Sequence, residues 1–386
     1  NYRLGALGFM AGDGMTGNYG LMDQRLALQW TQDNIKSFGG NPAKVTVGGQ
    51  SAGAMSVGSH LISPGSKGLF SKAIMESNCL GMPYHTRTSA KKNADAMYDY
   101  LKCTAGDMEC MKAKTADEIV DAQGAAVKMD RKTLFINFLP FAPMVDPSDP
   151  DAVLPKQPLD ALAAGELQQM PILSGSLYDE GTLFVDELFP TKMSKTKYHT
   201  VVDAIFGLHN AKKIKKAYPM IEGDKDGRSA FNVLATDLIF YCPLRNVTRG
   251  MQQTLGSAAV PTYQYRFKHV LSFDCWGPNY AFCVGKVCHG SELPFVWNVF
   301  EGTAGDDSFS YNATPDERQL ALDMNNAWVN FMTSPNPNTG LAVPQTYPLY
   351  DPSTSPLVIL DEPDYSNEND PRAEYCDMWD SMGYFY

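Results

Sequence analysis

The sequence contains no apolar run of the roughly 18 residues that a membrane-spanning helix requires. Basic charge is also scarce, because 32 lysines and arginines are outnumbered by 43 aspartates and glutamates, for a formal net charge of −11. Phosphate backbones bind to basic surfaces, so this deficit argues against nucleic acid as a partner. No cysteine pair has the C-x-x-C spacing of zinc sites, and neither an internal repeat nor an interdomain linker is visible. We therefore predict one globular domain over residues 1–386, with no membrane span.

A signal peptide and an initiator methionine are likewise missing from the first residues, NYRLGALGF. This stretch is typical of the end of a strand that enters a loop. We therefore expect the natural protein to continue upstream of residue 1.

Eight cysteines and two N-x-S/T sequons, at Asn246 and Asn312, are present. An even cysteine count together with glycosylation sequons favours an oxidising secretory compartment. The spacing of Cys103 and Cys110 suggests a short disulfide. We predict a secreted, disulfide-bonded glycoprotein.

The stretch VTVGGQSAGAMSVGSHLISP, residues 45–64, contains the pattern G-x-S-x-G at Gly49, Ser51 and Gly53. One interpretation is a nucleophile elbow, in which the serine lies on a strained strand-to-helix turn and the two glycines leave room for the backbone. The alternative is a glycine-rich turn with a capping serine.

Short buried-type strands alternate with helical segments from residue 45 onward, which indicates an α/β fold. We predict a mostly parallel, twisted central sheet with helices on both faces. Two helical insertions are expected within this domain, over residues 86–134 and 186–260.

A serine nucleophile needs a base, and the base needs an orienting acid. Among six histidines, His289 is distinguished by its place in a loop before a glycine, after most of the sheet has formed. Between Ser51 and His289, Glu180 follows the apolar run PILSGS and fits the acid, with Asp179 as the rival.

Several long motifs resemble those of one family: NYRLGALGF, GNYGLMDQRLALQWTQDNIKSFGGNPAKVTVGGQSAGAMSVGSHLISP, YDEG, HGSELPFVW and CDMWD. Their order and spacing resemble those of the type-B carboxylesterases and cholinesterases, with the fungal lipases of the same group, over essentially the whole chain. The resemblance implies an α/β-hydrolase fold, with Ser51 as nucleophile, Glu180 as acid and His289 as base.

The resemblance also implies the disulfides Cys103–Cys110 and Cys242–Cys376. The other four cysteines lie outside the family's usual pattern. Proximity in the sequence suggests Cys275–Cys283, which would leave Cys79 and Cys288 as a pair that locks the histidine loop.

Two positions depart from the family pattern. Gln50 stands before the serine where glutamate is usual, and Glu76, followed by Ser77, stands where glutamine is usual. We hypothesise that Glu76 restores a carboxylate near His289, with Glu292 as a second, to stabilise an imidazolium. The alternative is drift in a protein that no longer needs this charge.

The family's HGGG loop, which supplies two oxyanion donors, has no counterpart here, so that only the backbone N–H of Ala52 remains. The loss of one such donor costs roughly 10²- to 10³-fold in rate. We therefore expect a separate upstream fragment, either cleaved from this chain or continuous with it, to complete the site.

Leu183 and Glu187 stand where cholinesterases carry aromatic residues, which argues against choline esters. Leu139 and Phe141 match the acyl-pocket stretch, and their bulk suggests a confined acyl group. The predicted function is hydrolysis of small-molecule or lipid esters without a cofactor or metal ion. The alternative is a cholinesterase-like structural or adhesive domain with little or no catalysis.

Overall fold

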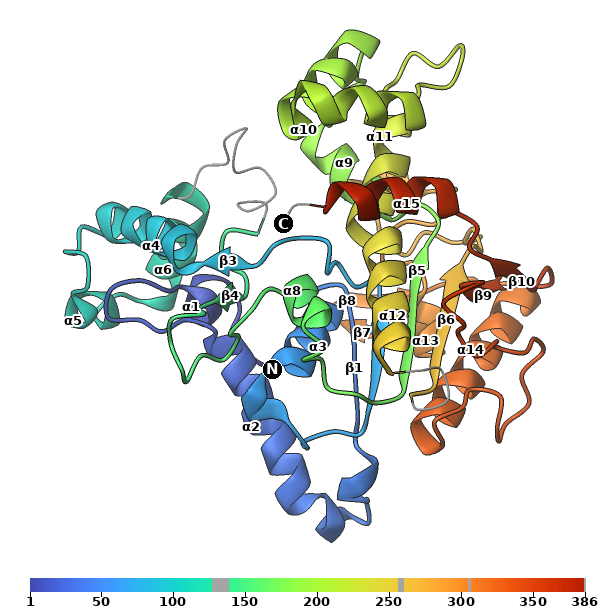
Figure 1. The fold of residues 1–386 in the computed structure, drawn as a ribbon, viewed down its shortest axis with the longest axis horizontal. Helices are drawn as coiled ribbons and strands as arrows, with labels where there is room; N and C mark the ends of the chain where they lie inside the picture. Colours follow the sequence, from blue (N-terminus) through green and yellow to red (C-terminus); the bar gives the residue numbers. More distant parts are fainter. Residues whose placement is uncertain (127–138, 256–259, 305–306, 385–386) are drawn as a thin grey trace.

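The computed structural model describes residues 1–126, 139–255, 260–304 and 307–384. Its central sheet has six strands in the order β1-β2-β5-β6-β9-β10 (Figure 1). Neighbouring strands are parallel except β9 and β10, which are antiparallel. The strands are β1 (Thr46–Gln50), β2 (Lys72–Glu76), β5 (Ile172–Leu177), β6 (Thr262–Phe267), β9 (Pro356–Leu360) and β10 (Ser366–Asn369). Two two-stranded sheets lie apart from it, formed by β3 (His85–Thr86) with β4 (Met144–Val145) and by β7 (Glu301–Ala304) with β8 (Asp307–Ser310).

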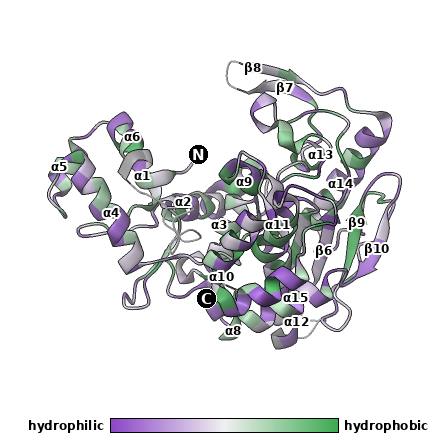
Figure 2. Ribbon diagram, turned by 90° about the horizontal axis from the view of Figure 1, so that it is seen from above, coloured by the Kyte–Doolittle hydropathy of each residue, from purple (hydrophilic) through white to green (hydrophobic). Residues whose placement is uncertain are grey.

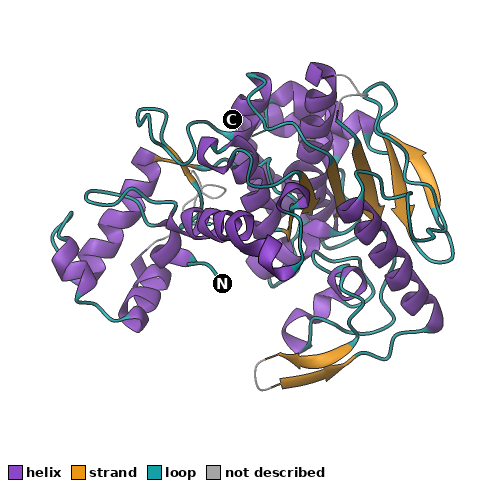
Figure 3. Cartoon of the chain, turned by 90° about the horizontal axis from the view of Figure 1, so that it is seen from below, coloured by secondary structure: helices purple, strands orange, loops and turns teal. Residues whose placement is uncertain are grey.

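Helices lie on both sides of the central sheet, as predicted (Figure 3). The α-helices are α1 (Gly5–Phe9), α2 (Tyr19–Asn34), α3 (Ala52–Ile62), α4 (Arg87–Leu101), α5 (Met108–Lys112), α6 (Ala116–Ala126), α8 (Pro158–Ala163), α9 (Glu180–Leu188), α10 (Lys195–Ala217), α11 (Arg228–Ala235), α12 (Cys242–Leu255), α13 (Leu293–Val296), α14 (Pro315–Thr333) and α15 (Ala373–Met382). A π-helix, η4 (Thr236–Tyr241), joins α11 to α12. Short 3₁₀ helices cover Ile35–Phe38, Pro42–Lys44, Pro64–Ser66 and Pro278–Cys283.

Alternating side chains of β2 explain why the sheet is covered on both faces. Ala73 and Met75 pack with Val57 of α3 and Val247 of α12. Ile74 lies in a different cluster, together with α14 side chains. Successive residues of a strand point to opposite faces, so the three consecutive apolar residues at the centre of β2 need helices on each side.

The predicted helical insertions occupy two regions of the fold. Helices α4, α5 and α6 pack together at a distance from the central sheet, at the left of Figure 1. Residues 127–134 of this insertion lie outside the described residues. The second insertion contains the end of α9, then α10, α11, η4 and α12. The first residues form the helix Gly5–Phe9, so the strand end expected there is wrong.

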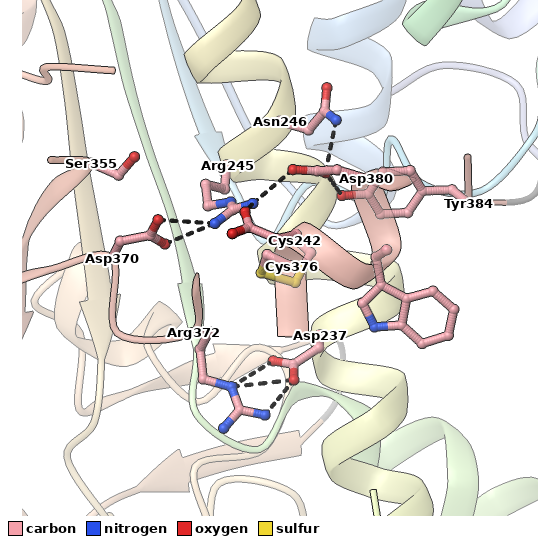
Figure 4. Close-up of a disulfide and its surroundings, with 12 residues drawn as sticks. Asp237, Cys242, Arg245, Asn246, Ser355, Asp370, Arg372, Cys376, Asp380 and Tyr384 are labelled. Carbon is pink, nitrogen blue, oxygen red and sulfur yellow. Dashed lines mark hydrogen bonds and ion pairs between the residues drawn. A yellow bond between two sulfur atoms is a disulfide. The ribbon is translucent and has the colours of Figure 1, made fainter. Parts of the chain in front are cut away.

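The C-terminal helix α15 is fastened to α12 and the π-helix by a disulfide and by ion pairs (Figure 4). The disulfide joins Cys242 to Cys376. Arg245, almost fully buried, contacts Asp370 at 2.9 Å, Asp377 at 2.6 Å and Asp380 at 2.7 Å. A further ion pair links Arg372 to Asp237 of the π-helix. These contacts hold the π-helix in place from its outer side.

The peripheral helices carry both hydrophilic and hydrophobic residues (Figure 2). Within the described residues, no helix combines the length and apolar character needed to cross a bilayer.

Candidate active site

Ser51 lies in the turn between the end of β1 and the start of α3. Its φ of 55° and ψ of −118° are strained for a residue with a side chain. The Ser51 N–H donates to the Glu76 carbonyl at 2.9 Å, and the Ser51 carbonyl accepts from Met55 N at 2.8 Å. The turn is therefore held by β2 on one side and by the first turn of α3 on the other.

Only one of the two motif glycines is required by close packing. A Cβ at Gly49 would lie 2.4 Å from the Gly53 carbonyl carbon, so a larger residue is excluded there. A Cβ at Gly53 would meet no described atom within 4 Å. The expectation that both glycines make room for the backbone is thus met at Gly49 alone.

His289 and Glu180 form a buried hydrogen-bonded pair. Nδ1 of His289 lies 2.5 Å from Oε2 of Glu180. The other carboxylate oxygen, Oε1, accepts from Ser77 Oγ at 2.6 Å and from Leu177 N at 2.8 Å. Both oxygens of the completely buried Glu180 therefore have hydrogen-bond partners, which fix the orientation of its carboxylate.

Asp179, the rival acid, has a different role in the structure. Its Oδ2 accepts from Val287 N at 2.9 Å, and its backbone N–H donates to the Val287 carbonyl. Asp179 therefore fastens the loop that carries His289, while Glu180 contacts the imidazole.

Two other histidines, His60 and His85, lie in other surroundings. His60, which is buried, contacts Ser66 and Gln24, and burial lowers its pKa to about 4. His85 contacts Ser89 and the Leu139 carbonyl. Both histidines thus serve as buried hydrogen-bonding groups away from Ser51.

A cavity of about 70 Å³ adjoins the nucleophile candidate. Ser51, Ala52 and Leu139 line it, whereas Phe141 does not and packs half-buried elsewhere. Cys79, which was expected beside the site in a disulfide, lines the cavity too. The remaining lining residues, which were not predicted as part of the site, are Met82, Phe184, Ile239 and Phe240. The rings of Phe184 and Phe240 each lie 5.0 Å from the His289 ring between centroids, so Ser51 and His289 border the same aromatic pair.

Gln50 occupies the side of the imidazole that faces away from Glu180. Its Nε2 lies 3.3 Å from Nε2 of His289. Within the described part of the chain, no hydrogen bond joins Ser51 Oγ to this nitrogen. Since Nδ1–H points to Glu180, Nε2 is an acceptor, and the Gln50 amide donates to it.

Glu76 and Gln50, which exchange identities relative to the family pattern, are direct Cα partners in the pairing of β1 with β2. Glu76 Oε1 accepts from Trp328 Nε1 at 2.6 Å. Burial raises the pKa of Glu76 to about 7, although the Trp328 hydrogen bond opposes the shift. Its charge is thus only partly present at neutral pH.

Glu292 is completely buried, and within the described residues neither carboxylate oxygen has a hydrogen-bond partner. Burial, reinforced by the nearby charges of Glu76 and Glu180, raises its pKa well above the ordinary value. This shift opposes the charge that Glu292 would need in order to stabilise an imidazolium. Among the described hydrogen bonds, neither Glu76 nor Glu292 contacts His289.

We expect Glu76→Gln to change the pH dependence of stability. The folded state keeps a proton on Glu76 that the unfolded chain releases above its ordinary pKa of 4.5, so this residue lowers stability as pH rises from about 4.5 to 7. The variant should therefore gain up to about 3 kcal/mol over the native protein at pH 8 relative to pH 5. Equilibrium unfolding in urea at both pH values measures the difference.

The control for that measurement is Glu109→Gln, because Glu109 is exposed on α5. Identical pH dependence of the Glu76 variant and the native protein would contradict the expectation. The turnover of the same variant tests the hypothesis from the sequence: a lowered rate supports an electrostatic role for Glu76, and an unchanged rate supports drift.

Three disulfides are present in the structure. Cys103–Cys110 and Cys242–Cys376 pair as expected. The third joins Cys283 to Cys288, so the expected pairs Cys275–Cys283 and Cys79–Cys288 are wrong. The turn at Gly285, with φ of 76°, brings Cys283 and Cys288 to a Cα separation of 5.6 Å, within the range of a disulfide. Cys79 is instead a free thiol in the wall of the Ser51 cavity, and Cys275 is also free.

The comparisons with known proteins agree with this geometry. The model of the carboxylesterase family matches residues 1–379. This chain belongs to the carboxylesterase family. The resemblance inferred from its motifs is confirmed, and so is the predicted α/β-hydrolase fold.

Two relatives and one solved structure illustrate the similarity to other family members. The chain is 37% identical to the cAMP-regulated D2 protein of Dictyostelium discoideum, over 98% of this chain and 68% of that protein. It is 31% identical to the para-nitrobenzyl esterase of Bacillus subtilis, over 97% of this chain and 70% of the relative. A solved PNB esterase is 30% identical, with a TM-score of 0.76, over 98% of this chain and 73% of the other.

Proposed function

We propose that this member of the carboxylesterase family is a serine carboxylic-ester hydrolase that acts through an acyl-enzyme. The observation that carries the proposal is the buried His289–Glu180 hydrogen bond beside the cavity that contains Ser51 on its strained turn. Esterase relatives support the same reaction class.

In the proposed mechanism, Ser51 Oγ attacks the ester carbonyl while His289 Nε2 takes the Ser51 proton. Glu180 keeps the proton of His289 on Nδ1 and stabilises the imidazolium that forms. The imidazolium then donates its Nε2 proton to the departing alcohol oxygen. Water, deprotonated by the same nitrogen, attacks the acyl-enzyme and releases the carboxylic acid.

Ala52 is the proposed oxyanion donor of this chain. It is the first residue of α3, so its N–H has no partner within the helix. A helix N-terminus favours the negative charge that develops on the carbonyl oxygen during attack.

The second candidate is a cholinesterase-like structural or adhesive domain with little or no catalysis. The contact between the Gln50 amide and His289 supports this second candidate. The amide donates to His289 Nε2, which is the nitrogen that would have to accept the Ser51 proton during catalysis. For catalysis, the serine hydroxyl must displace that amide.

Hydrolysis of p-nitrophenyl acetate and butyrate by native material distinguishes the two candidates. The enzyme proposal expects turnover, together with stoichiometric phosphonylation of Ser51 by a p-nitrophenyl phosphonate, detected by peptide mass spectrometry. No hydrolysis and no labelling would favour the structural domain.

We further propose that β1 pairs with an additional strand from a segment of the same protein, joined to this chain or cleaved from it. β1 is the edge of the sheet, and an unpaired edge strand exposes hydrogen-bonding groups. On α2 and the short helix that follows it, apolar side chains are also exposed, namely Leu26, Trp30 and Phe38. The segment would also supply the missing oxyanion donors. The mass of the protein purified from its natural source, measured by native mass spectrometry, tests this proposal. A mass equal to that of this chain alone would contradict it.

Secretion is proposed from the three disulfides and the sequons.

We expect glycosylation at Asn312, which is exposed in the loop before α14, and none at Asn246, whose amide donates to Asp380 within packed helices. After secretion from a eukaryotic host, peptide-N-glycosidase F should reduce the mass. Asn312→Gln should abolish this change and Asn246→Gln should not; the reverse pattern would contradict the assignment.

A further inference from the structure

The second half of α10 is an amphipathic helical segment with an exposed basic side. Gly207, with φ of 71° and ψ of 156°, interrupts the helix, and residues 208–217 continue it. Ala211 and Ile214 of this segment are completely buried, in the same apolar cluster as Phe231 of α11. Three exposed lysines, which we call the lysine face, lie on its other side, namely Lys212, Lys213 and Lys216.

Charge is segregated in this part of the molecule. Residues 192–217 contain seven lysines and a single acidic residue, Asp203, although acidic residues outnumber basic ones in the whole chain. Asp203 is paired with Lys215 at 2.6 Å, and among the described residues no ion pair involves the lysine face. Acidic residues resume at Glu222, in the loop after α10. The basic excess is therefore local and is not neutralised by neighbouring acids on α10.

The stability of the helix does not explain the lysine face. The helix dipole favours cations in the last turn, which accounts for Lys215 and Lys216. Lys212 and Lys213 lie before that turn. Lys212 and Lys216 are four residues apart, and like charges at this spacing are destabilising. An anionic partner would relieve the repulsion, so a role in binding fits this face better than a role in folding.

An exposed aliphatic side chain flanks the lysine face in the sequence on each side. Leu208, 81% exposed, is the most exposed large hydrophobic residue in the described part of the chain, and Ile221 is 68% exposed. A soluble acidic polymer, such as a sulfated glycan, offers no apolar layer to these residues. A bilayer offers both partners, because anionic headgroups attract lysines and acyl chains lie just beneath the headgroups.

We propose that the lysine face, with Leu208 and Ile221, binds this protein to anionic lipid surfaces. This binding is a role additional to the proposed ester hydrolysis and does not depend on it. Helices α9, α10 and α11 lie at the edge of the central sheet where the parallel strands end, at the top of Figure 1. Ser51 follows β1 and Glu180 begins α9 after β5, so both lie at the same edge. Binding through α10 therefore turns this edge of the sheet toward the lipid.

Co-sedimentation with vesicles tests the assignment. The native protein should bind vesicles of equal parts phosphatidylcholine and phosphatidylserine, and it should not bind phosphatidylcholine alone. An increase in salt from about 0.05 to 0.5 M should weaken binding about tenfold or more, because salt screens exposed charges. Equal binding to both kinds of vesicle, or binding to neither, would overturn the proposal.

The charge variant combines Lys212→Gln, Lys213→Gln and Lys216→Gln. Each lysine near an anionic surface contributes about fivefold to binding, so the loss should be on the order of a hundredfold. The control changes the net charge equally at three exposed lysines of the α4–α5 region, with Lys92→Gln, Lys102→Gln and Lys112→Gln. It should bind vesicles within about twofold of the native protein. Equal losses in the two variants would indicate an effect of net charge alone and contradict the assignment.

Leu208→Asn distinguishes a lipid surface from a soluble polyanion. It should weaken vesicle binding about threefold or more, because an apolar contact is lost, and leave any binding to heparin unchanged. Binding of the native protein to heparin but not to vesicles would overturn the lipid assignment in favour of a sulfated glycan. None of these measurements requires turnover, so their failure is distinct from a failure of the proposed ester hydrolysis.

Discussion

Ser51→Ala is expected to lower kcat for p-nitrophenyl butyrate by about 10⁴- to 10⁶-fold, with little change in KM. Removal of the nucleophile of a Ser-His-acid unit eliminates the acyl-enzyme route, and only binding and oxyanion stabilisation remain. The cavity around Ser51 is formed by side chains that the substitution does not alter. Steady-state kinetics on native material measures the effect.

Ser71→Ala is the matched control for this variant. Ser71 donates to the Val45 carbonyl near the opposite end of β1, far along the strand from the nucleophile turn. It should leave kcat unchanged within a few fold. If Ser51→Ala retained the native rate, the hydrolysis would not proceed through this serine, and the structural candidate would gain support.

Arg245→Ala is expected to lower the free energy of unfolding by about 3–5 kcal/mol. The guanidinium is almost completely buried between α12 and α15 and contacts three aspartates. Figure 4 shows two of them, Asp370 and Asp380. Removal of the guanidinium leaves Asp380 without this ion-pair partner, and it leaves Arg249, 2.9 Å from Asp370 and 3.7 Å from Asp377, to balance the other two carboxylates. Urea unfolding at pH 7, followed by circular dichroism, measures the loss.

The control for this measurement is Lys112→Ala, because Lys112 pairs with Glu109 on the exposed surface of α5. An exposed pair contributes about 0–1 kcal/mol, so this variant should unfold near the native midpoint. Equal stability of the two variants would contradict the assignment of Arg245 as the anchor of α15.

Some residues of the site could be predicted from the sequence, and others could not. Ser51, Glu180 and His289 could be named as candidates from the sequence because each follows a local pattern of strand, turn and loop and matches a motif of the family. Ile239 and Phe240 were not, since they belong to a π-helix, whose residues have no apolar periodicity that marks a cavity wall. The exchange of Gln50 and Glu76 was visible in the sequence, but its consequence was not, because the two residues meet only through the pairing of β1 with β2.

Local chemistry was determined by the sequence alone: a serine on a glycine-bounded turn, apolar strands that require helices on both faces, and motifs sufficient to indicate the family. Tertiary structure decided which polar groups meet. It set the Gln50 amide against His289 Nε2, left Glu292 buried without a partner among the described residues, and joined Cys283 to Cys288. The physical reason is that hydrogen bonds, pKa shifts and disulfides depend on distances of a few ångströms, which spacing along a chain does not specify.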